Sequence, residues 1–123
     1  EFQQTSMAMK IQYLEIVSND VQAVCDTYST IHSVTFSEPV EGLGNALTTT
    51  LPDGSMIGVR KPMHETEVPT IRPYWLVKDV QKAYDLALNS GATEAHSPLE
   101  IPGIGKFAIY INGDIMQGLW QNI

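Results

Sequence analysis

Cysteine, basic residues and long apolar runs are scarce in this chain of 123 residues. The single cysteine, Cys25, cannot form a disulfide within the chain, which fits a protein of the reducing cytoplasm. Seven Lys and Arg stand against fourteen Asp and Glu, a net charge of -7. Without a basic cluster, the chain is not expected to bind nucleic acid or an anionic membrane surface. No apolar run approaches the length needed to cross a membrane.

The start of the chain lacks the charged and then apolar order of a signal peptide. We expect residues 1–8 to be a tag remnant or a disordered start, with the native chain beginning at Met7 or Met9. The remaining length, with 43% apolar residues overall, suits a single compact domain over residues 9–123.

What the sequence does have is a repeat. Asp20-Val21-Gln22 returns as Asp79-Val80-Gln81, and Met56-Ile57-Gly58-Val59 returns as Met116-Gln117-Gly118-Leu119. Each Asp-Val-Gln follows a strand-like run and opens a helix-like run, and each Met-x-Gly-aliphatic segment follows a turn. A repeat of this kind predicts one supersecondary module used twice.

Periodicity and capping residues predict the elements of both modules. In module 1 (9–61) we expect strands over 10–18, 33–37, 43–51 and 55–60 and a helix over 20–31. A polar linker follows over 62–69. In module 2 (70–123) we expect strands over 70–78, 94–96, 106–111 and 115–121 and a helix over 79–90. Each module therefore reads strand-helix-strand-strand-strand, and the fold class is α+β.

Alternation along the strands separates a helix-packed face from an opposite face. Leu14, Ile16, Ile57 and Val59, and in module 2 Trp75, Val77 and Leu119, are expected to pack against the helices. The opposite face is amphipathic and aromatic, which is typical of a ligand pocket, although such a face can also simply pack or form a dimer interface. It carries Tyr13, Glu15, Met56, Gly58 and Arg60 from module 1 and Arg72, Tyr74, Met116, Gly118 and Trp120 from module 2.

The second half carries a more specific resemblance. Asp79-Val80, Ser90-Gly91-Ala92, the run over 101–108 and Gly118-Leu119-Trp120-Gln121 resemble the glyoxalase-like branch of the vicinal oxygen chelate superfamily, which includes bleomycin-resistance proteins and extradiol dioxygenases. The resemblance covers nearly all of residues 10–122, and the first half departs more from the pattern. It implies two tandem βαβββ modules forming a curved mixed sheet cup, with the helices on the outer face, and a homodimer.

The resemblance also locates the positions where metal-binding members of the superfamily hold their ion. These members use His, Glu or Gln, one from the first and one from the last strand of each module. The repeat places these positions at Tyr13, Gly58, Arg72 and Gly118. Glycine has no donor and arginine is cationic, so we expect no metal and no other cofactor. The three histidines are not related by the repeat, and Cys25 is expected to be an inert core thiol.

These observations favour a cytoplasmic protein that binds a small, partly aromatic or apolar molecule in the cup without a metal. Tyr13, Tyr74 and Trp120 would stack on the ligand, and the two glycines would open space for it. Two alternatives stay open. One is a metal-dependent enzyme of glyoxalase or dioxygenase type with displaced ligands. The other is a metal-free lyase or isomerase that uses Glu15 as general acid or base.

Overall fold

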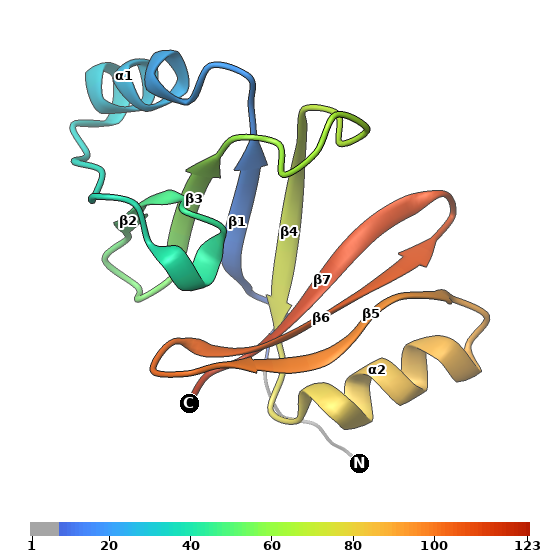
Figure 1. The fold of residues 1–123 in the computed structure, drawn as a ribbon. Coiled ribbons are helices and arrows are strands. Elements are labelled where there is room, and N and C mark those ends of the chain that lie inside the picture. Colours follow the sequence, from blue (N-terminus) through green and yellow to red (C-terminus); the bar gives the residue numbers. More distant parts are fainter. Residues whose placement is uncertain (1–7) are drawn as a thin grey trace. The chain divides into compact units, whose positions relative to one another are not determined.

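Residues 8–123 are described in a computed structural model, and they form seven β-strands, two α-helices and one short 3-10 helix (Figure 1). The fold class is α+β with parallel and antiparallel strand pairs, as predicted. The chain divides into two compact units, one of Tyr13–Arg72 and one that combines residues 8–12 with Pro73–Ile123. We call them the N-proximal unit and the C-terminal unit. The predicted tag or disordered start lies outside the described residues, except for Ala8.

The N-proximal unit contains most of β1 (Ile11–Val17), together with β2 (Leu47–Thr50) and β3 (Met56–Arg60). Strand β3 lies between the other two, parallel to β1 and antiparallel to β2. Leu51 and Ser55 close the β2–β3 turn, where Gly54 adopts a left-handed φ of 91°. The turn predicted ahead of the Met56-Ile57-Gly58-Val59 segment is therefore confirmed.

Helix α1 (Val21–His32) covers one face of β3. Asp20 caps its first turn by accepting a hydrogen bond from the backbone N–H of Ala23 at 3.1 Å. Ile16, Cys25 and Val59 form the buried cluster beneath the helix, so the predicted helix-packed face and core thiol are confirmed. Ile31, the last residue of the predicted helix, is 65% exposed.

In the segment after α1 the structure differs from two predictions. Ser33 ends the helix in a left-handed conformation, and residues 33–37 form no strand. The strand predicted to begin at Leu43 begins at Leu47, because Glu41–Leu43 form a 3-10 turn and Gly44 and Asn45 have positive φ values. Module 1 therefore has two strands after its helix where three were predicted.

The C-terminal unit contains β4 (Thr70–Leu76) from Pro73 onward, α2 (Val80–Asn89), β5 (Thr93–Ile101), β6 (Gly105–Asn112) and β7 (Ile115–Gln121). This is the strand-helix-strand-strand-strand order predicted for module 2. The strands lie in the order β4-β7-β6-β5, with β4 parallel to β7 and the other pairs antiparallel. Strand β5 is much longer than the predicted 94–96.

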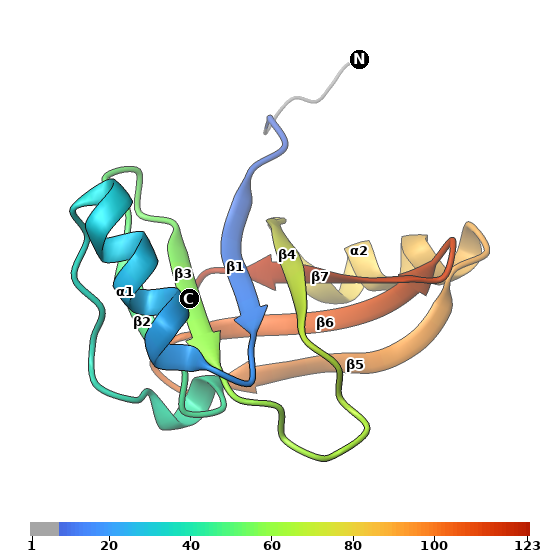
Figure 2. The same ribbon diagram turned by 90° about the horizontal axis from the view of Figure 1, so that it is seen from above.

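Helix α2 packs on one face of the C-terminal strands, against β5, β6 and β7 (Figure 2). Val80 and Tyr84 meet Ala108 and Leu119 in a buried cluster. Asp79 caps the helix through the N–H of Lys82 at 3.0 Å, and the Gln121 side chain accepts from the N–H of Val80 at 2.9 Å. The site residues expected on these strands therefore lie on the face away from α2. Neither helix in residues 8–123 is long and apolar enough to cross a membrane.

Candidate functional site

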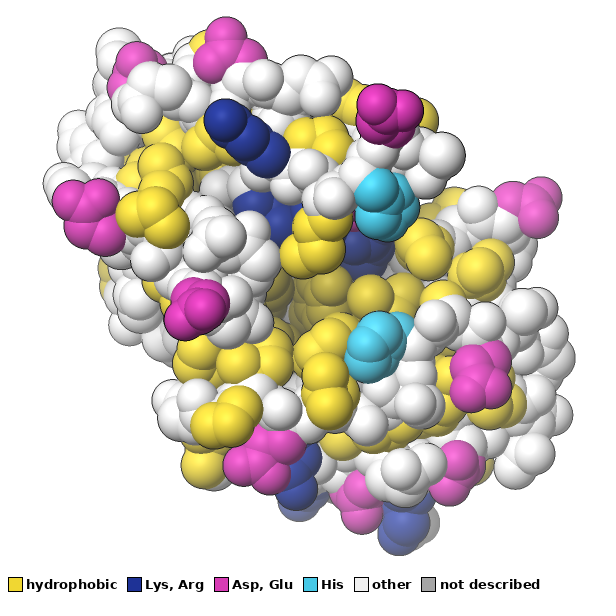
Figure 3. Space-filling model, in the orientation of Figure 1, with side chains coloured by type: hydrophobic (Ala, Val, Ile, Leu, Met, Phe, Trp, Pro, Cys, Tyr) yellow, Lys and Arg dark blue, Asp and Glu magenta, His cyan; other side chains and the backbone are white. Residues whose placement is uncertain are grey.

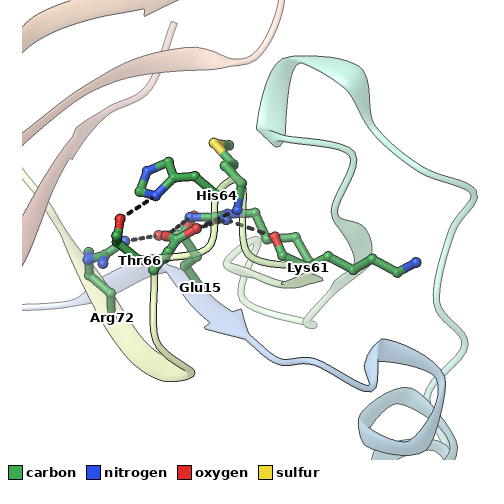
Figure 4. A network of polar contacts seen from close by, with 8 residues as sticks. Glu15, Lys61, His64, Thr66 and Arg72 are labelled. Atoms are coloured by element: carbon green, nitrogen blue, oxygen red, sulfur yellow. Dashed lines mark hydrogen bonds and ion pairs between the residues drawn. The ribbon is translucent and has the colours of Figure 1, made fainter.

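A buried ion-pair network occupies the predicted site face of the N-proximal unit (Figure 4). Glu15 on β1 accepts from Nε of Arg60 at 2.8 Å and from a terminal nitrogen of Arg72 at 2.6 Å. The three side chains are 4–9% exposed. Sequence analysis placed these three residues on one face, and the structure brings them into direct contact.

Glu67 completes the network from the predicted linker. Its two carboxylate oxygens accept from both terminal nitrogens of Arg60, at 2.9 and 2.7 Å, and one also accepts from the N–H of Met63 at 2.7 Å. The hydrogen bonds from Arg60 lower the pKa of Glu67 to about 2. The bonds to Glu67, and then those to Glu15, raise the pKa of Arg60 despite its burial. Glu67 was not predicted, because nothing in a polar loop marks which of its carboxylates bonds Arg60, seven residues earlier.

The network balances its own charge, with two guanidinium groups against two carboxylates. Buried charges persist only when they are paired and hydrogen-bonded. Here Arg60 also donates to the carbonyl oxygen of Lys61, and Glu67 also accepts from the N–H of Met63. Lys61, although adjacent in sequence, points its ammonium group away from the network in Figure 4. Through Glu67 the segment 61–69 is bonded to Arg60 on β3, and through Arg60 it is connected to Glu15 on β1.

Two glycines make room for tyrosine rings of their own units. A Cβ atom at Gly58 would collide with the hydroxyl of Tyr13 and would lie 2.7 Å from Cζ. A Cβ atom at Gly118 would likewise collide with the ring of Tyr74. The expectation that these glycines leave open space for a ligand is therefore wrong, since aromatic rings fill that space. Burial, the largest cause, raises the pKa of Tyr13.

The site face of the C-terminal unit is aromatic. Tyr74 makes edge contacts with Phe107 and Trp120, each at a ring-centroid distance of 6.2 Å. Trp120 is only 4% exposed, and its ring lies where a Cβ atom of Gly105 would otherwise be. Met116 on the same face is 43% exposed. Sequence analysis predicted Tyr74, Trp120 and Met116 but missed Phe107.

An open pocket of about 740 Å³ lies elsewhere in the N-proximal unit. It is bordered by the start of α1, by Gly44 and Asn45, and by the segment from Arg60 to Met63. Of the predicted site residues only Arg60 contributes to it, so it is not the predicted sheet face. In Figure 3 the acidic side chains lie scattered over the surface shown and do not gather around one opening.

This chain is similar to solved structures, although its sequence alone finds no relative. The sequence matches no protein-family model and no curated protein. A hypothetical protein from Bacillus halodurans has a TM-score of 0.74 at 12% identity, over 95% of this chain and 96% of that chain. Methylmalonyl-CoA epimerase from Mycobacterium tuberculosis has a TM-score of 0.71 at 13% identity, over 91% and 87%. A glyoxalase/bleomycin resistance protein/dioxygenase superfamily member from Vibrio splendidus has a TM-score of 0.65 at 12% identity, over 95% and 100%.

The chain has the vicinal oxygen chelate fold. The resemblance seen in the sequence is confirmed at the level of the fold, and at these identities the likeness establishes the fold alone. The function of the chain must therefore be argued from the chemistry of its individual residues.

The residues at the positions where the superfamily resemblance implies metal ligands do not fit a metal ion. Tyr13 lies over Gly58, and Arg72 is committed to Glu15. Glu15, the nearby carboxylate, carries a guanidinium on each oxygen. Within residues 8–123, no group of three or more His, Cys, Asp or Glu could hold an ion. A divalent ion would have to displace an arginine to reach a donor here.

Proposed function

We propose that this protein binds a small molecule with an aromatic or apolar planar part, and that it does so without a metal. The observation that carries the proposal is the character of the face that the vicinal oxygen chelate fold devotes to ligands. In this chain that face has an internally neutralised ion network in the N-proximal unit and a cluster of aromatic rings in the C-terminal unit. Aromatic and methionine side chains favour planar apolar ligands through stacking and adaptable contact.

The proposed ligand-binding residues are those predicted from the sequence, and the structure shows how buried each of them is. Tyr13, Glu15, Gly58, Arg60 and Arg72 are buried, which suits a rigid floor. Met56 is half-buried on β3 beside Tyr13. On β4 and β7 of the C-terminal unit, Tyr74, Gly118 and Trp120 are likewise buried, and Met116 is 43% exposed.

The use of Glu15 as a general base receives less support. A general base needs a carboxylate oxygen within reach of a substrate proton. Glu15 is 6% exposed and holds two arginines, which is the geometry of a structural ion network. One of the similar structures is an epimerase, and at 13% identity its likeness to this chain carries the fold and not the chemistry.

The test combines a metal assay with a ligand screen on the purified full chain. We expect no stoichiometric metal by elemental analysis, and no change in melting temperature when Ni, Zn, Fe or Mn is added and then chelated. We expect planar aromatic compounds to raise the melting temperature in a concentration-dependent manner. Stoichiometric metal that a chelator removes with loss of stability would contradict the metal-free part. A screen without any stabilising planar compound would contradict the binding part.

Homodimer formation and a cytoplasmic location belong to the same proposal. The superfamily resemblance supports pairing, and the single buried cysteine is compatible with a reducing compartment. Light scattering coupled to size exclusion should give twice the 13.6 kDa chain mass.

A further inference from the structure

His96 on β5 is turned onto the aromatic face by irregular strand pairing. Glu94 pairs with Tyr110, yet His96 pairs with Ile109, so β5 has one residue more than β6 across this step. A second extra residue follows before Leu99 pairs with Phe107. Bulges of this kind re-aim side chains and are frequent beside functional sites.

The consequence of the first bulge is a change of face. Ala108 and Tyr110 point toward α2, because both pack in the cluster around Val80 and Tyr84. In regular pairing His96 would lie opposite Ala108 and would face the helix. The bulge places it opposite Ile109 instead, on the same face as Phe107.

The imidazole of His96 is held in one orientation. Its ring lies on Phe107 with centroids 4.8 Å apart and planes inclined by 34°. Its Nδ1 is 2.7 Å from the carbonyl oxygen of Ser97. A carbonyl oxygen can only accept, so Nδ1 carries the proton, and in the neutral ring Nε2 is left as a hydrogen-bond acceptor.

The surroundings of this acceptor are apolar and aromatic. Phe107 is half-buried and contacts the ring of Tyr74, which contacts that of Trp120, and these last two rings are buried beneath the face. Leu99, 52% exposed, and Met116 lie on the same face, while His96 itself is exposed. An oriented acceptor beside these rings suits a planar molecule that bears a donor at its edge.

We propose that Nε2 of His96 accepts a hydrogen bond from the O–H or N–H group of a planar ligand bound on the aromatic face of the C-terminal unit. This inference rests on the proposed function and names the ligand class and a residue that recognises it. The sequence marked His96 only as one of three histidines unrelated by the repeat, because a bulge cannot be read from the repeat.

The experiment compares 2-naphthol, which has an O–H donor, with 2-methoxynaphthalene, which has the same rings and none. Dissociation constants would be measured by NMR titration on the full chain. We expect 2-naphthol to bind roughly fivefold more tightly, as one hydrogen bond warrants. His96→Phe keeps the ring on Phe107 and should abolish this preference. His32→Phe, a matched change at another exposed histidine, should leave it intact.

The possible outcomes separate this inference from the proposed function. Equal binding of both probes to wild type and His96→Phe would overturn the role of His96 and leave metal-free binding standing. Failure of both probes to bind would overturn the inference and count against the proposed function as well. Imidazole ¹⁵N shifts give a ligand-free test that needs no variant. A proton on Nε2 in place of Nδ1 would overturn the assignment.

Discussion

Glu15 shows why a residue's partners matter more than its type. A carboxylate on this face of the vicinal oxygen chelate fold could ligate a metal, move a proton or pair with cations. The guanidinium groups of Arg60 and Arg72 at 2.8 and 2.6 Å select the third role. Removing any one member would leave the network with one uncompensated buried charge, which is why such networks are costly to break.

Glu67 offers the sharpest residue-scale test, because its carboxylate holds Arg60 from a loop. Glu67→Gln should lower the free energy of unfolding at pH 7 by about 1–2 kcal/mol through loss of the charged bidentate pair. The folded-state pKa of Glu67, about 2, lies below its ordinary value of 4.5. Its contribution is therefore fully present above about pH 4.5 and is lost as the pH falls toward 2.

Urea denaturation of wild type and Glu67→Gln at pH 7, 4 and 3 measures this difference. The gap between the two proteins should narrow as the pH is lowered. Glu65→Gln, a change at an exposed neighbour in the same loop, serves as the matched control and should have little effect at any pH. A gap that stays constant from pH 7 to pH 3 would show that Glu67 acts through something other than its charge.

At the scale of elements, the two helices depend on equivalent caps. Asp20 and Asp79 each accept a hydrogen bond from a first-turn N–H, at 3.1 and 3.0 Å. Asp20→Ala and Asp79→Ala should each cost about 1 kcal/mol of unfolding free energy, whereas the Asn variants should cost less because Asn also caps. Chemical denaturation of the four variants measures both effects. Equal losses for Ala and Asn would indicate that the charge matters and the cap does not.

The elements also show where sequence reasoning succeeds and where it stops. The helices and β7 were predictable because caps, helical spacing and the repeated Met-x-Gly segment are local signals. Strand β5 was underestimated, since its bulges break the alternation that marks a strand. The Glu15–Arg60–Arg72 contacts followed from strand faces. The positions of Glu67 and His96 could not be predicted in this way, because the first depends on the path of a loop and the second on the register of a strand.

At the scale of the whole molecule, the chain crosses between its two compact units inside strands. Strand β1 supplies Ile11 and Gln12 to the C-terminal unit and its remaining residues to the N-proximal unit. Strand β4 divides in the same way at Arg72 and Pro73. Neither unit can therefore lose its strand pairing without disturbing a strand that the other uses. This continuity argues for one cooperative unfolding transition.

Cys25 provides a probe of that cooperativity, because it is 3% exposed in the N-proximal core and burial raises its pKa. A thiol reagent should label it only when the unit opens. Leu119→Ala creates a cavity in the core of the C-terminal unit and should cost about 2–4 kcal/mol. If the units open together, this change in the other unit should accelerate Cys25 labelling by at least tenfold. An unchanged labelling rate together with a lowered melting temperature would mean that the units open separately. Leu86→Ala, which replaces an exposed residue on α2, controls for effects of the substitution itself.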